Sequence, residues 1–128
     1  MPSPQKPNVL VVDDDPAVCN SLKFSLELEG FEVRTFCAAA DLLSATDLPR
    51  SGCLVIDYHM PSINGLELHR RLREQGNTMP AILTTTAPDP ALRRRASALG
   101  VSLVEKPLLG NLLVEAIRAR LAPSHSVT

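Results

Sequence analysis

The run VLVVDDD, from Val9 to Asp15, constrains the fold of this chain more than any other segment. Four apolar, mostly β-branched residues predict a buried strand that delivers a cluster of carboxylates at its carboxyl end. Two like charges about 4 Å apart repel each other by roughly 4 kcal/mol at an effective dielectric constant near 20. Because a folded chain keeps such a cluster only with a counter-ion, the run predicts an ion-binding site.

A second apolar strand, Cys53 to Ile56, also ends on an acid, Asp57. Hydrophobic periodicity and turn residues predict three more strands and five helices. The strands are expected at 31–36, 81–85 and 101–104, and the helices at 16–29, 38–46, 65–75, 88–99 and 108–121. This alternation with short loops predicts an α/β protein with a parallel sheet covered on both faces.

In open parallel sheets, the functional site lies beyond the carboxyl ends of the strands. The residues that the predicted strands place there are Asp13, Asp14, Asp57, Thr85 and Lys106. We interpret Asp15 differently, as the N-cap of the helix that begins at Pro16.

The composition fits one domain, since 128 residues with 45% hydrophobic content can bury about two-thirds of the unfolded surface. A net charge of −1 gives no overall attraction to nucleic acid or anionic lipid. No apolar run approaches the length of about 18 residues that spans a membrane. We expect a flexible arm at residues 1–7, the domain at 8–121, and a tail or the start of a linker at 122–128.

The three cysteines, Cys19, Cys37 and Cys53, are odd in number and lack the spacing of metal ligands. We expect all three to be small buried hydrophobic residues in a reducing, cytoplasmic environment. The three histidines, His59, His69 and His125, have no common partners, so histidine catalysis and metal ligation by imidazole are not expected.

Four motifs occur in order and at matching spacing: VVDDDP, LVIDYHMPSINGLEL, the threonine that follows PAILT, and EKP at Glu105 to Pro107. With them, the chain resembles the receiver domain of two-component response regulators over essentially all of Val9 to Leu121. The resemblance implies a doubly wound, flavodoxin-like receiver fold with five helices and strand order 2-1-3-4-5.

The resemblance also implies that Asp57 is the phosphoacceptor, which takes a phosphoryl group from a sensor histidine kinase or a phosphotransfer protein. Magnesium would be bound by Asp14 and Asp57 directly, by the backbone carbonyl of His59, and by Asp13 through water. Lys106 would pair with Asp57 before the reaction and with a phosphoryl oxygen afterwards.

Two further expectations come from the family pattern. Thr85 would donate its hydroxyl to the phosphoryl group, and the bond between Lys106 and Pro107 would be cis. Charge patterning, independently of the family, predicts that Arg93, Arg94 and Arg95 form a solvated helix face rather than a partner-binding surface.

The chain departs from the receiver pattern at two positions. Leu103 stands where receivers commonly carry Tyr or Phe, so switching by an aromatic ring is not available. Thr86 stands where Ala or Gly is usual, and its bulk is expected to narrow access to Asp57.

Phosphorylation is expected to rearrange the fourth helix, fifth strand and fifth helix, through which a homodimer would form. DNA would be bound only through an output domain beyond this chain; a single-domain regulator is the other possibility. Two alternatives stay open: a receiver-like binding module that takes no phosphate, and an aspartyl-phosphate hydrolase that uses Asp13 and Asp15.

Overall fold

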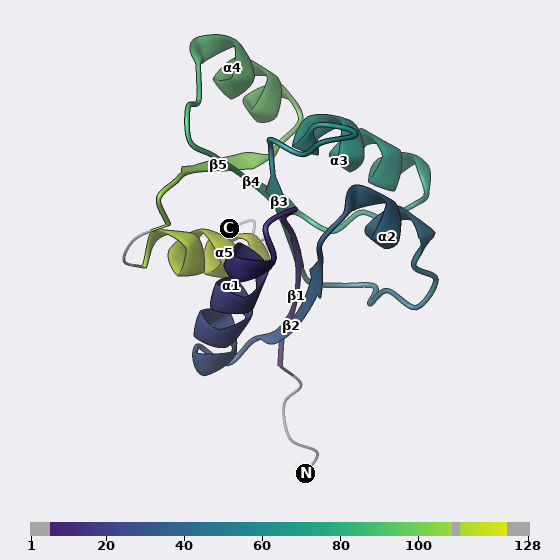
Figure 1. Ribbon diagram of the computed structural model, residues 1–128, viewed down its shortest axis with the longest axis vertical. Coiled ribbons are helices and arrows are strands. Elements are labelled where there is room, and N and C mark those ends of the chain that lie inside the picture. Colours follow the sequence, from purple (N-terminus) through teal and green to yellow (C-terminus); the bar gives the residue numbers. More distant parts are fainter. Residues whose placement is uncertain (1–5, 109–110, 123–128) are drawn as a thin grey trace, which may run out of the picture.

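A computed structural model describes residues 6–108 and 111–122, which form one five-stranded parallel sheet flanked by helices (Figure 1). The strands lie in the order β2-β1-β3-β4-β5, as the resemblance to receiver domains implies. Their bounds are β1 Asn8–Val12, β2 Glu32–Phe36, β3 Cys53–Asp57, β4 Ala81–Thr85 and β5 Ser102–Glu105. The helices are α1 Pro16–Leu28, α2 Ala39–Ser44, α3 Gly65–Glu74, α4 Pro90–Ala98 and α5 Leu112–Leu121.

Each face of the sheet has its own hydrophobic core, because successive strand residues point to opposite faces. In β1, Val9 and Val11 pack with α1 and α5, whereas Leu10 and Val12 pack with α2, α3 and α4. Figure 1 shows the same two layers, with α1 and α5 on one side of the sheet and α2 and α3 on the other. Burial on both faces explains the uninterrupted apolar runs of the central strands.

Side-chain caps fix where three helices begin. Asp15 accepts a hydrogen bond from the Ala17 N–H at 2.9 Å, which confirms its predicted role as the N-cap of α1. Asn64 accepts from the Glu67 N–H at 2.8 Å and starts α3 directly after the loop that leaves β3.

Asp89 caps α4 by accepting from the Leu92 N–H, so the prediction that this helix begins at Pro88 was wrong by two residues. Asp89 precedes Pro90, and the proline ring disfavours the helical region for the residue before it. Asp89 is accordingly extended, with φ −96° and ψ 168°. None of the described helices has the length and apolar character needed to cross a membrane.

Two elements at the C-terminal end also differ from the prediction. The fifth strand is Ser102–Glu105 rather than 101–104, because the Val101 N–H donates to Ala96 and still belongs to the end of α4. The last helix begins at Leu112 rather than Leu108, and its first hydrogen bond runs from the Glu115 N–H to the Asn111 carbonyl. The intervening positions 109–110 lie outside the described residues.

The prediction that all three cysteines are buried was wrong for one of them. Cys19 and Cys53 are buried on the α1 and α5 face of the sheet, but Cys37 is exposed. Cys37 follows Phe36, so alternation turns its side chain to the α1 and α5 face, but β2 has ended there and Cys37 lies outside the core on that face.

Gly65, the first residue of α3, packs tightly against the end of β3. Its N–H donates to the Tyr58 carbonyl at 2.9 Å. A Cβ atom there would lie 2.8 Å from the Asp57 carbonyl oxygen and 3.0 Å from Ile56 Cγ2. Only a residue without a side chain fits this contact between helix and strand.

We therefore expect Gly65→Ala to lower the free energy of unfolding, measured by urea denaturation, by about 1–3 kcal/mol. Alanine ordinarily stabilises a helix relative to glycine, so the sign of the change identifies the steric contact. A variant at least as stable as the original chain would contradict the close packing.

Candidate functional site

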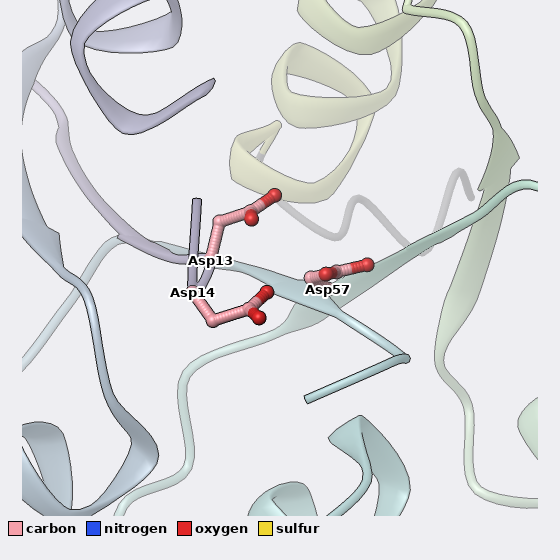
Figure 2. Close-up of side chains that lie close together, drawn as sticks. All are labelled: Asp13, Asp14 and Asp57. Atoms are coloured by element: carbon pink, nitrogen blue, oxygen red, sulfur yellow. The ribbon is translucent and has the colours of Figure 1, made fainter. Parts of the chain in front are cut away.

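Neighbouring strands bring three carboxylates together at one edge of the sheet. Strand β1 pairs with β3 in a register that sets Val12 beside Ile56, so the residues that follow meet at the same edge. Carboxylate oxygens of Asp13, Asp14 and Asp57 all lie within 4.8 Å of one another. Figure 2 shows the three groups gathered at the strand ends, with the carboxylate of Asp14 turned toward Asp57.

Lys106 brings a positive charge to this cluster from the end of β5. Its Nζ lies 3.2 Å from Asp13 Oδ2 and 3.3 Å from Asp57 Oδ1. The Lys106 N–H donates to the Thr85 carbonyl at 2.7 Å, which ties its backbone to the end of β4. The Lys106–Pro107 peptide bond is cis, as predicted.

Burial dominates the electrostatics of Asp57, which is 6% exposed. Desolvation raises the pKa of Asp57 above its ordinary value, and the negative charge of Asp13 raises it further. Lys106 and the backbone N–H of His59 act in the opposite direction, because both favour the ionised carboxylate. The balance leaves Asp57 with a raised pKa.

The pKa of Lys106 is raised as well. Burial lowers it, but the nearby carboxylates of Asp13 and Asp57 outweigh this effect, so the ammonium form is strongly favoured. One ammonium group therefore faces three carboxylates, and the cluster retains an excess of negative charge. Such an excess beside a low-dielectric core favours the binding of a cation.

The chemistry of the cluster fits a hard divalent cation. Its ligand atoms are carboxylate oxygens only, which suit magnesium and not soft metals. Asp13 and Asp57 are buried, whereas Asp14 is exposed, so the cluster opens to solvent on the side of Asp14. A partly hydrated cation can enter from that side, as magnesium keeps several of its waters.

Thr85 is fully buried at the end of β4. Its hydroxyl accepts a hydrogen bond from the Ala87 N–H at 3.4 Å, within its own loop. The register of β3 and β4 sets Thr84, not Thr85, directly opposite Asp57. Thr84 was not among the residues predicted for the site, although strand register follows from the period of two in the apolar residues.

The two departures from the receiver pattern have defined surroundings. Leu103 is half-buried on β5 and packs against the core shared by α2, α3 and α4. Thr86 is exposed, one residue beyond the end of β4, at the same edge of the sheet as the acidic cluster. The three arginines Arg93 to Arg95 are all exposed on α4, as predicted.

The described histidines do not bring imidazole groups together. His59 is exposed beside Tyr58, with ring centroids 4.9 Å apart, and it contributes its backbone N–H to Asp57. His69 is buried in α3, where burial lowers its pKa and the positive charge of Arg73 lowers it further. His125 lies outside the described residues.

Comparison with known proteins shows the family of this chain. The family model for the response regulator receiver domain matches residues 9–118. The transcriptional regulatory protein FixJ of Azorhizobium caulinodans is 39% identical over 122 residues, which cover 94% of this chain and 58% of that protein. TdiR of Thauera aromatica is 35% identical over 115 residues, which cover 89% of this chain and 51% of that protein.

Solved structures agree with the sequence comparison. The crystal structure of FIXJ-N superposes with a TM-score of 0.81 at 34% identity, covering 91% of this chain and 94% of that chain. The response regulator TrrA of Thermotoga maritima, in complex with Mg2+ and BeF, gives a TM-score of 0.76 at 28% identity, covering 90% and 99%.

The chain belongs to the response regulator receiver domain family and is a receiver domain of the two-component response regulators. It spans between half and three-fifths of the length of the curated relatives FixJ and TdiR. The hydrolase alternative is not supported, since Asp15, its second acid, is exposed and caps α1 instead of joining the cluster.

The excess of negative charge has a measurable cost in stability. Without divalent cations, Asp57→Asn is expected to raise the free energy of unfolding at pH 7 by about 1 kcal/mol. The pKa of Asp57 is higher in the folded chain than in the unfolded chain. The ionised carboxylate therefore destabilises the fold only at pH values above the pKa that Asp57 has in the unfolded chain. Lowering the pH through the raised pKa toward the ordinary value should remove the difference between variant and original chain.

Urea unfolding at a series of pH values measures this effect. The matched control is Glu32→Gln, which removes an exposed carboxylate on β2 and should change stability by less than about 0.5 kcal/mol. Destabilisation by Asp57→Asn at neutral pH would contradict this prediction, because it would show that Lys106 fully compensates the negative charge of the cluster.

Proposed function

We propose that Asp57 is the phosphoacceptor of this receiver domain and takes its phosphoryl group from a histidine kinase or phosphotransfer protein. The observation that carries the proposal is the convergence of three carboxylates and Lys106 at the carboxyl end of a parallel sheet. Lys106 contacts both Asp13 and Asp57, and Asp57 is the one of the two that ends the central strand β3.

In the proposed reaction, a carboxylate oxygen of Asp57 forms a bond to phosphorus while the bond from phosphorus to the donor histidine nitrogen breaks. Phosphoryl transfer passes through a loose transition state, so positioning and charge neutralisation supply most of the catalysis. Lys106, 3.3 Å from Asp57, holds the carboxylate before transfer and can follow the new phosphoryl oxygen afterwards.

The proposed magnesium site comprises Asp14, Asp57 and the backbone carbonyl of His59, with Asp13 acting through water. Bound magnesium would neutralise charge on the phosphoryl oxygens and on the carboxylates. The related response regulator TrrA was solved in complex with Mg2+ and BeF, which supports the same ion in this chain.

Thr85 is proposed to donate its hydroxyl to the phosphoryl group after transfer. Its hydroxyl accepts from the Ala87 N–H in this structure, and that bond leaves the O–H proton free to be donated. Movement of Thr85 toward the phosphoryl group would carry the signal toward α4, with Leu103 repacking in place of an aromatic ring.

The remaining proposals concern the protein around this domain. We propose that the domain comprises residues 8–121 and is located in the cytoplasm. The only reactions that we propose it catalyses are its own phosphorylation and dephosphorylation. We propose that a homodimer forms through α4, β5 and α5. The names of the relatives FixJ and TdiR, which are transcriptional regulatory proteins, support DNA binding through a separate output domain.

Incubation with Mg2+ and acetyl phosphate tests the phosphoacceptor directly. Intact-mass spectrometry is expected to show one added phosphoryl group, and Asp57→Asn should abolish it. Asp47→Asn, which removes an exposed carboxylate in the loop after α2, should be phosphorylated like the original domain. Modification that persists in Asp57→Asn would disprove the assignment, and absence of modification by both acetyl phosphate and a cognate kinase would identify a binding module.

Thr86 provides a second test of the site. We expect Thr86→Ala to be phosphorylated severalfold faster by acetyl phosphate, because the smaller side chain widens access to Asp57. Thr78→Ala is the matched control, since Thr78 is exposed near the opposite, amino-terminal end of β4 and should leave the rate unchanged. Equal rates for Thr86→Ala and the original domain would reject this role of Thr86.

A further inference from the structure

An apolar groove lies between α3 and α4, on the face of the sheet that these two helices cover together with α2 (Figure 1). Its volume is about 480 Å³, which is in the range of pockets that hold small molecules. Leu66 of α3, with Ala98 and the exposed Leu99 at the end of α4, supplies apolar walls. No residue of the acidic cluster lines the groove, so it is separate from the proposed phosphorylation site.

His69 of α3 also lines this groove, and its polar atoms are unsatisfied. The residue is 3% exposed, and neither ring nitrogen has a hydrogen-bond partner among the described residues. Burial lowers the pKa of His69, so the ring is neutral at neutral pH and keeps one N–H donor. A buried donor without a partner is unfavourable, and a ligand that accepts a hydrogen bond would relieve this cost.

The charged residues that line the groove are three arginines and one glutamate, so positive charge is in excess there. Arg70 is held by two glutamates of its own helix, and Arg73 donates to two backbone carbonyls beyond the end of α3. Arg95 of α4 is exposed, and its guanidinium makes neither an ion pair nor a hydrogen bond in the part of the chain that the structure describes. Arg95 is therefore the cation that is available to a ligand.

We propose that this groove binds a small carboxylic acid with an apolar body, of the size of a medium-chain fatty acid. The carboxylate pairs with Arg95, and the apolar body lies against Leu66 and Leu99. When the ring of His69 turns toward the groove, a carboxylate oxygen also accepts its N–H.

Charge and size select this class of ligand. The free guanidinium favours an acid over a neutral apolar molecule of the same shape. The volume favours a small molecule over a partner helix, because an α-helix about 10 Å wide would fill it with little more than one turn.

Titration of the isotope-labelled chain with octanoate, followed by amide NMR, tests the proposal. Saturable shifts of amides in α3 and α4 at millimolar octanoate are the expected result. Octanol, which has the same apolar chain without the charge, should bind severalfold more weakly. Equal affinity for octanoate and octanol, or shifts that do not saturate, would overturn the proposal.

Substitution of Arg95 separates the ion pair from the apolar contact. Arg95→Gln should weaken octanoate binding by about three- to fivefold, as expected for an ion pair that solvent partly screens, and should leave octanol binding unchanged. Arg94→Gln is the matched control, since Arg94 is exposed on the same helix but does not line the groove. Equal weakening by both variants would reject a specific contact with Arg95.

A second variant closes the groove without touching its charges. Ala98 is exposed, so Ala98→Trp should fold normally, occupy the groove and abolish octanoate binding. Ala91→Trp, at an exposed position of α4 that does not line the groove, should bind octanoate like the original chain. Binding of an acidic helical peptide at α3 and α4, without binding of octanoate, would assign the groove to a protein partner and overturn the proposal.

Discussion

The repulsion among three carboxylates, which one lysine compensates only in part, is the constraint on which the rest of the structure depends. Asp13, Asp14 and Asp57 converge within 4.8 Å, and Lys106 reaches two of them. The two apolar cores on either side of the sheet hold the strand ends in this arrangement. The fold thus maintains an electrostatically unfavourable cluster ready for a cation and for the transfer of a phosphoryl group.

The connections around the cluster explain how it is both rigid and responsive. Gly65 lets α3 pack directly against the end of β3, which fixes the backbone of Asp57. On the other side of the cluster, β4 ends at Thr85, and the hydroxyl of Thr85 accepts from the Ala87 N–H in the loop that follows. Loops with few such contacts are where a switch between two states can be accommodated at small energetic cost.

Most of the fold could be predicted because the signals were local. The apolar runs that end at Val12 and Ile56 marked the buried strands, and Asp15 marked the start of α1. Predictions failed where competing local signals overlapped. The start of α4 was placed too early because Pro88 and Pro90 both resemble a first helical residue, and only the extended backbone of Asp89 separates them.

The sequence by itself determined which groups are present, that they follow buried strands, and, through its receiver motifs, the family to which the chain belongs. Only the tertiary structure decided how these groups interact, because register and packing set distances between residues far apart in the chain. It alone showed that Lys106 contacts Asp13 as well as Asp57, and that Cys19 is buried whereas Cys37 is exposed. Such contacts depend on where side chains point after the sheet has twisted and the helices have packed, which no local pattern encodes.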